Sequence, residues 1–203
     1  MGSGRVIAYV DGYNLYIGLK AKGRRYLWLD LKALMYRYLL ENQSLVQVKY
    51  FTSRIQSPRE SVLRQSRYID VLRESGVAII EGRHGGDPLR CECGRTISMP
   101  GEKMTDVNIA LEVARDSFRS DFDTAFLVTG DSDQVPTVGL VREVSPAQRV
   151  VVLFPPERVS KHLKSVAHAA LNINEASLRE SQFPESVKLG SGVTIRRPDH
   201  WRS

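Results

Sequence analysis

Short, largely apolar runs recur along this sequence, and each one ends in a turn signal. They occupy residues 6–10, 46–51, 77–80, 125–128 and 150–154. Short runs of this kind, rich in β-branched residues and bounded by turns, are typical of buried strands. Between them lie longer segments whose apolar residues follow helical spacing. The alternation predicts an α/β fold in which helices cover both faces of a parallel sheet of about five strands.

The same pattern sets the expected domain organisation. The chain has 203 residues, a length typical of one domain, and residues 1–180 carry the alternation. Residues 82–102 interrupt it with glycines, prolines and both cysteines, which favours a long loop or a hairpin insertion. Residues 181–203 are polar and weakly periodic. We expect this tail to be partly disordered or docked on the surface.

Composition narrows the class of partner and the compartment. The chain has 29 Lys+Arg and 23 Asp+Glu, and its formal net charge of +6 gives weak support to an anionic partner such as RNA. Its two cysteines, Cys91 and Cys93, are too few for a disulfide framework and favour a reducing, cytoplasmic setting. No signal leader and no apolar run of about 18 residues is found, so no membrane partner is expected.

Carboxylates stand at the ends of two predicted strands. Asp11 directly follows the first apolar run, and Asp131 and Asp133 follow the fourth. In open parallel sheets, ligands bind at the carboxyl ends of strands where the strand order reverses, and the first and fourth strands are often neighbours there. Asp106 begins a helical stripe over residues 106–115. We therefore expect the four side chains to face one crevice.

Such a cluster has a definite chemistry. Neighbouring carboxylates repel one another unless protons or a cation offset their charge. Mg²⁺ and Mn²⁺ prefer oxygen ligands, and a metal of this kind activates water and neutralises charge on a phosphate. The other interpretation is that an aspartate after a strand forms a turn or caps the next helix, as Asp106 and Asp131 could each do. Composition and spacing alone leave both interpretations open.

Three motifs occurring in this order resemble the NYN domain family of PIN-like nucleases, in the bacterial branch that includes the LabA-like proteins. They are Asp-Gly-Tyr-Asn-Leu-Tyr at 11–16, Lys-Met-Thr-Asp-Val-Asn-Ile-Ala at 103–110 and Thr-Gly-Asp-Ser-Asp at 129–133. The resemblance covers about residues 5–180. It implies a PIN-like three-layer fold, with a central parallel sheet of about five strands flanked by helices.

The resemblance also implies an activity, the hydrolysis of phosphodiester bonds in RNA, with single-stranded RNA as the expected substrate. It implies a catalytic Mg²⁺ or Mn²⁺ site at four aspartates, Asp11, Asp106, Asp131 and Asp133. Asn14 and Thr129 are implied to hydrogen-bond to metal-bound water or to phosphate. The alternative is an RNA-binding or regulatory protein of the same fold with little or no catalysis. A cluster of negative charge where a phosphate must sit favours the enzyme over the binder.

The cysteine pair suggests a second metal. Cys91 and Cys93 are spaced like half a zinc knuckle, and His84 is a candidate third ligand. Structural zinc sites usually have four ligands, so the fourth would come from another residue or from a second chain. Zn²⁺ binding and a homodimer are therefore further hypotheses beside a plain reduced loop.

Basic and aromatic residues flank the predicted acidic site. The basic candidates for holding an RNA backbone are Arg24, Arg25, Arg83 and Lys103. Tyr13 could stack on an unpaired base, whereas Tyr16 is expected to pack inside the protein. The alternative interpretation of the basic residues is an ordinary solvated surface.

Overall fold

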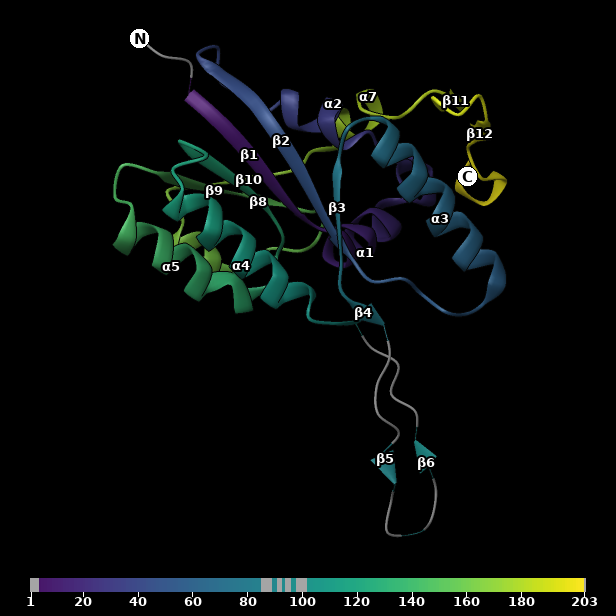
Figure 1. Ribbon diagram of the computed structural model, residues 1–203, viewed down its shortest axis with the longest axis horizontal. Coiled ribbons are helices and arrows are strands. Elements are labelled where there is room, and N and C mark those ends of the chain that lie inside the picture. Colours follow the sequence, from purple (N-terminus) through teal and green to yellow (C-terminus); the bar gives the residue numbers. More distant parts are fainter. Residues whose placement is uncertain (1–3, 85–88, 91–92, 94–95, 98–101, 203) are drawn as a thin grey trace.

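The computed structural model describes residues 4–202 except 85–88, 91–92, 94–95 and 98–101. At its centre lies a six-stranded parallel sheet with the order β10-β9-β8-β1-β2-β3 (Figure 1). Its strands are β1 (Gly4–Asp11), β2 (Gln43–Thr52), β3 (Ala78–Glu81), β8 (Thr124–Val128), β9 (Arg149–Phe154) and β10 (Ala169–Asn172). The predicted α/β class is confirmed, with β10 as one strand more than the five expected.

Helices cover both faces of the sheet. They are α1 (Gly12–Lys22), α2 (Leu31–Tyr36), α3 (Arg59–Glu74), α4 (Thr105–Phe118), α5 (Val135–Val144), α6 (Lys161–Val166) and α7 (Glu175–Glu180). β1 alternates between two cores: Val6, Ala8 and Val10 pack with residues of α1, α2 and α3. Ile7 and Tyr9 point the other way and pack with residues of α4, α5 and α6. This period of two makes β1 the common wall of both cores.

The strand order reverses between β1 and β8, which lie side by side at the centre of the sheet. From β1 the chain enters α1 on one face, and from β8 it passes through the short 3₁₀ helix η2 (Ser132–Gln134) into α5 on the other. The two connections thus leave the same edge in opposite directions. This is the point at which open α/β sheets form a ligand crevice.

A two-part arm follows β3 (Figure 1). β4 (Arg83–His84) pairs antiparallel with β7 (Glu102–Lys103), and β5 (Leu89–Arg90) pairs antiparallel with β6 (Thr96–Ile97). The arm extends away from the sheet and returns the chain to α4. The described residues thus place antiparallel pairs in the segment for which a loop or hairpin was expected.

The C-terminal segment, residues 181–202, lies against the face formed by α1, α2 and α3. It contains the antiparallel pair β11 (Ser186–Lys188) and β12 (Thr194–Arg196), followed by the 3₁₀ helix η3 (Asp199–Trp201). The Trp201 ring packs on the rings of Trp28 and Tyr68, at centroid distances of 6.1 and 5.9 Å. The Trp28 indole N–H donates to the Pro184 carbonyl at 2.9 Å. In the described part of the chain, no helix has the length and apolar content needed to cross a bilayer.

Candidate active site

Asp11 is the last residue of β1 and also caps α1. It is buried, and its Oδ1 accepts a hydrogen bond from the backbone N–H of Asn14 at 2.9 Å. Its Oδ2 accepts from the Thr129 hydroxyl, also at 2.9 Å. Because Thr129 follows β8, this contact ties the carboxyl ends of the two central strands together. The carboxylate is therefore held in one orientation from two sides.

Asn14 and Thr129 contact protein groups in the structure, and their hydrogen bonds to metal-bound water or phosphate stay a prediction. The Asn14 side-chain oxygen accepts from the backbone N–H of Gly130 at 2.9 Å. The Thr129 hydroxyl also accepts from the backbone N–H of Asp131 at 3.1 Å, and the residue is fully buried. Both side chains position the loop between β8 and η2. The Asn14 side-chain oxygen and the Thr129 hydroxyl thus bond to the scaffold, as buried polar groups usually do.

Gly130 permits a close approach of two loops. A Cβ atom at this position would collide with the carbonyl oxygen of Arg158, in the loop after β9. Any larger residue would therefore displace the backbone that joins Thr129 to Asp131. The turn motif after β8 requires glycine for space rather than for an unusual backbone angle.

Asp131 caps η2, in agreement with the interpretation that an aspartate after a strand caps the next helix. Capping uses only one of its oxygens. Its Oδ1 accepts from the backbone N–H of Asp133 at 3.0 Å. Among the described residues, no hydrogen bond or ion pair reaches Asp131 Oδ2 or the Asp133 carboxylate. Asp131 therefore has one oxygen available to a ligand while the other fixes the start of the helix.

Asp106 lies in the first turn of α4 and does not cap it. The residue before the helix is Met104, which turns the chain through a left-handed conformation with a φ of 73°. The Asp106 backbone carbonyl accepts from the Gln134 side-chain N–H at 3.2 Å. Gln134 is buried and accepts in turn from the Thr137 hydroxyl at 2.9 Å. Through this contact, the segment that carries Asp131 also fixes the position of Asp106.

Three of the aspartates interact electrostatically. The pKa of Asp106 is raised, first because partial burial disfavours its charged form and then because Asp131 and Asp133 bring negative charge close to it. In the folded protein the protonated form of Asp106 is thus favoured relative to the unfolded chain. As the pH rises from the ordinary pKa of an aspartate to this raised pKa, the folded protein therefore loses stability. A cation bound near these carboxylates would offset that loss.

The donor set fits an open divalent-cation site rather than a closed cage. Within the described ranges, no three His, Cys, Asp or Glu side chains converge closely enough to hold a metal by themselves. Mg²⁺ does not need such a cage, since it is commonly held by one or two carboxylates together with water and substrate phosphate. Asp106 and Asp131 have oxygens for this role that no hydrogen bond or ion pair from the described residues reaches. Both oxygens of Asp11 already accept hydrogen bonds, although a carboxylate oxygen can accept more than one.

A cavity of about 750 Å³ opens beside these residues. Asp11, Asp106 and Asp131 line it, whereas Asp133 does not. The rest of its wall comes from one face of α1, the end of β2, the start of α3 and the C-terminal segment. The cavity is therefore acidic where the strands end, and aromatic and basic side chains line it elsewhere together with apolar and small polar ones. It is large enough for a small molecule or for part of a polymer.

Only part of the predicted RNA-binding set lies at this cavity. Tyr13 and Arg24 line it, while Arg25, Arg83 and Lys103 do not. Arg25 faces Glu175 instead, at 3.5 Å. Tyr16, expected to pack inside the protein, is 39% exposed and lines the cavity as well.

Four further basic residues that line the cavity were not predicted from the sequence. They are Lys20, Arg64, Arg158 and His200. Lys20 could have been found from its spacing of four residues after Tyr16 on the same helix face. The other three come from elements whose placement the sequence pattern does not fix.

The zinc hypothesis stays a prediction. Cys93 is exposed, while Cys91 and the side chain of His84 lie outside the described residues.

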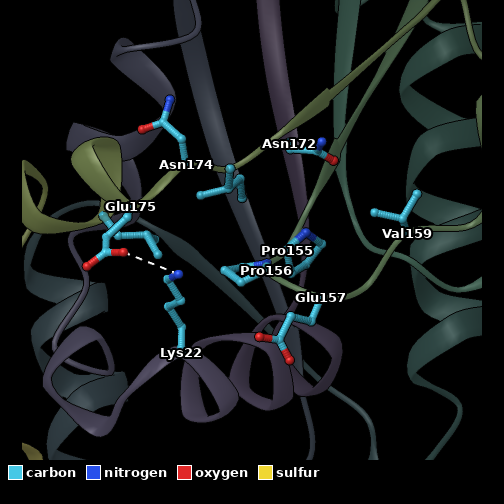
Figure 2. A pocket seen from close by; sticks show the side chains of 10 residues that line it. Lys22, Pro155, Pro156, Glu157, Val159, Asn172, Asn174 and Glu175 are labelled. Atoms are coloured by element: carbon cyan, nitrogen blue, oxygen red, sulfur yellow. Dashed lines mark ion pairs between the residues drawn. The ribbon is translucent and has the colours of Figure 1, made fainter.

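A second cavity of about 310 Å³ lies between the end of α1 and the carboxyl ends of β9 and β10 (Figure 2). An ion pair between Lys22 Nζ and Glu175 Oε2, at 3.2 Å, spans part of its wall. None of the predicted aspartates lines this second cavity.

Gln134 gives a first testable prediction. Gln134→Leu leaves the Asp106 carbonyl and the Thr137 hydroxyl without their partner, so we expect the free energy of unfolding to fall by about 1–3 kcal/mol. Because Asp106 also loses its support, any activity of the site should fall by about 10–100-fold. Urea unfolding and a rate measurement on the same samples would test this.

The matched control for this change is Gln148→Leu. Gln148 is similarly buried but hydrogen-bonds Ser117, away from the cavity. It should lose comparable stability and keep its activity per folded molecule. Equal losses of activity in the two variants would contradict a positioning role for Gln134.

Comparisons with known proteins add to this geometry. A family model for the NYN domain matches residues 5–174. The chain is 28% identical to 6-hydroxy-3-succinoylpyridine 3-monooxygenase HspA of Pseudomonas putida over 238 residues, covering 97% of this chain and 75% of that protein. It superposes with a TM-score of 0.58 on a protein of unknown function, VPA0982, from Vibrio parahaemolyticus, at 18% identity, covering 89% of this chain and 97% of that one. This last similarity concerns the fold alone.

Proposed function

The chain belongs to the NYN domain family, whose model matches residues 5–174, and on that premise we propose that it is a metal-dependent endoribonuclease acting on single-stranded RNA. This family is assigned to the PIN-like nucleases. One observation carries the proposal: Asp11, Asp106 and Asp131 come from three separate elements and line the same cavity. They do so where the strand order of the sheet reverses, which is the usual ligand site of such folds.

In this proposal each side chain has a distinct task. Asp106 and Asp131 offer Mg²⁺ or Mn²⁺ carboxylate oxygens that have no hydrogen-bond partner in the described part of the chain, and Asp11 lines the same cavity from the end of β1. When bound, the cation supplies Lewis-acid activation of water and charge neutralisation at the phosphate. Thr129 and Asn14 hold Asp11 and the loop after β8 at fixed positions. The scissile phosphate would enter through the cavity mouth beside Tyr13.

Binding of RNA without catalysis is the less favoured alternative. A phosphate group placed at the acidic end of the cavity would meet the charges of Asp11, Asp106 and Asp131. Without a cation those charges repel it. A site used only for binding has no need of this arrangement. The pKa of Asp106 is raised first by partial burial and then by the charges of Asp131 and Asp133.

A second candidate function is oxygenation of a small aromatic acid. Two observations favour it: the relative named as a 6-hydroxy-3-succinoylpyridine monooxygenase aligns over 97% of this chain, and the cavity has aromatic walls at Tyr50, Tyr68 and Trp201. An oxygen electrode would test it with that hydroxypyridine and NADH or NADPH as reductant. Substrate-dependent oxygen uptake would establish this function. Its absence, together with RNA cleavage, would leave the nuclease.

The nuclease proposal is tested by incubating end-labelled single-stranded RNA and DNA with the protein in Mg²⁺, Mn²⁺ or EDTA. We expect RNA cleavage with either metal, none in EDTA, and a rate lower by about 10²–10³-fold for Asp131→Asn. The control is Asp123→Asn, which removes an exposed carboxylate at the opposite end of β8, where it pairs with Arg5. Cleavage that survives both EDTA and Asp131→Asn would sink the proposal, as would no cleavage at all.

A further inference from the structure

The C-terminal segment, residues 181–202, helps to build the cavity although it lies beyond the residues 5–174 that the family model matches. His200 and Trp201 line the same cavity as Asp11. Trp201 is held there by its contacts with Trp28 and Tyr68, while His200 is exposed beside it. The segment is thus anchored by a buried ring and presents a polar ring to the cavity.

Positive charge gathers around this part of the cavity. Lys20, Arg24 and Arg64 line it together with His200. The pKa of His200 is lowered, first by the charge of Arg24, then by desolvation, and further by Arg64 and Lys20, although Glu60 acts in the opposite direction. The positive charges of Lys20, Arg24 and Arg64 therefore all lie close enough to His200 to lower its pKa.

Their charges are largely uncompensated. Among the described residues, no carboxylate forms an ion pair with Lys20 or Arg24. Arg64 lies 3.6 Å from Glu60, but the Glu60 side chain is 87% exposed, so solvent weakens this pair. The Arg64 guanidinium also donates to the Ser61 hydroxyl at 2.8 Å, which orients it. Such a cluster is suited to an anionic oxygen group from outside the chain.

The basic cluster and the aspartates stand at opposite ends of α1. Asp11 precedes this helix and Arg24 follows it, and its 11 residues span about 16 Å at about 1.5 Å per residue. Tyr13 and Tyr16 lie between the two ends and line the cavity, and Lys20 Nζ lies 5.8 Å from the centre of the Tyr16 ring. The helix face therefore presents two exposed aromatic rings and then cations, in that order.

We propose that Lys20, Arg24 and Arg64, closed off by His200 of the C-terminal segment, form a phosphate-binding subsite for single-stranded RNA, a few nucleotides away from the cleaved bond. The bases between the two phosphates stack on Tyr13 and Tyr16. This arrangement requires unpaired bases, because rings in a duplex are not available for stacking on side chains. The subsite rests on the proposed function, since it assigns the anion to the RNA backbone.

The test is an equilibrium measurement made in EDTA, so that it does not depend on cleavage. Fluorescence anisotropy of a labelled RNA of about 12 nucleotides gives the Kd over a range of salt concentrations. The double variant Arg24→Gln/Arg64→Gln should bind about tenfold more weakly. Its plot of log K against log salt should be shallower by about 1.4, because each lost phosphate contact on a single strand contributes about 0.7.

The matched control is Arg25→Gln/Arg67→Gln, which removes the same charge from the same two regions. Arg25 pairs with Glu175, Arg67 is exposed on α3, and neither lines the cavity. This variant should retain the wild-type affinity and slope. If both double variants weaken RNA binding equally, the binding comes from general surface charge rather than from a subsite, and the proposal is overturned.

Two further arms identify the source of the anion and the role of the C-terminal segment. Competition with 4-hydroxybenzoate distinguishes a small aromatic carboxylate from RNA: weaker carboxylate binding by Arg24→Gln/Arg64→Gln, with RNA binding unchanged, would overturn the proposal. His200→Ala should weaken RNA binding about two- to threefold, by removing the ring that closes the subsite. No change in that variant would exclude the C-terminal segment from the site. If RNA binds as predicted but is never cleaved, the nuclease proposal fails and the subsite stands.

Discussion

Asp106→Asn is expected to abolish RNA cleavage, by about 10²–10³-fold or more, while leaving the protein at least as stable as the wild type in EDTA. The pKa of Asp106 is raised by partial burial and by the charges of Asp131 and Asp133, so its ionised form costs folding free energy near neutral pH. The amide removes that cost. We expect a gain in stability of less than about 1 kcal/mol, the scale of partly exposed charge interactions.

The difference in stability between the wild type and Asp106→Asn should depend on pH. Below the ordinary pKa of an aspartate the wild type and Asp106→Asn should be equally stable. The variant should gain relative stability as the pH rises from that ordinary pKa to the raised pKa of Asp106, and should keep the gain above it. Added Mn²⁺ should stabilise the wild type more than the variant, since binding to the folded state alone stabilises it. Thermal unfolding with and without metal at several pH values measures both.

The control for Asp106→Asn is Asp70→Asn, which removes the carboxylate that lies 3.6 Å from Arg73 on α3. That variant should keep its activity and lose a little stability. If Asp106→Asn is instead destabilised as much as Asp70→Asn, and cleaves RNA normally, the acidic cluster has no functional meaning.

Gly130→Ala is expected to lose about 1–3 kcal/mol of stability and most of the activity. Its new methyl group would collide with the Arg158 carbonyl oxygen, and overpacking of this kind forces backbone shifts. Those shifts would fall between Thr129 and Asp131, and would also disturb the hydrogen bond from the Gly130 N–H to Asn14. Urea denaturation and cleavage rates per folded molecule would measure the two losses.

Gly139→Ala is the control, and it is expected to raise stability rather than lower it. Gly139 lies in α5, where an added Cβ meets no atom within 4 Å, so alanine should stabilise the helix by up to about 1 kcal/mol. Activity should be unchanged. A Gly130→Ala protein with wild-type stability and rate would show that the loop after β8 tolerates displacement, and that the close approach to Arg158 is not required.

The layered fold was predictable because its buried strands are largely apolar runs. β10 escaped that analysis because it lies at the sheet edge and two of its four residues are exposed. The docking of the C-terminal segment also could not be predicted from the spacing of apolar residues. It depends on isolated rings, Phe183 and Trp201 against Trp28, rather than on a repeating stripe.

The site was predictable to a similar extent. Asp11 and Asp131 follow apolar strands directly, so the sheet itself places them at one edge. The contact of Gln134 leaves no mark in the sequence, because its partner is a backbone carbonyl 28 residues away. Of the predicted basic residues, Arg24 lines the cavity, whereas Arg25, Arg83 and Lys103 do not. The cavity draws further cations from α1, α3 and the loop after β9, at Lys20, Arg64 and Arg158. Which helix face meets which loop is set by tertiary packing, which local patterns do not encode.

The nature of the products formed in ¹⁸O-labelled water tests the central claim most directly. If the carboxylates serve a metal-dependent hydrolysis, single-stranded RNA treated with the wild type and Mg²⁺ should yield fragments whose new terminal phosphate carries oxygen from the solvent. Mass spectrometry of the fragments would show it, and the signal should vanish in EDTA. Fragments ending in unlabelled 2′,3′-cyclic phosphate, or intact RNA after prolonged incubation with Mg²⁺ and Mn²⁺, would contradict the account.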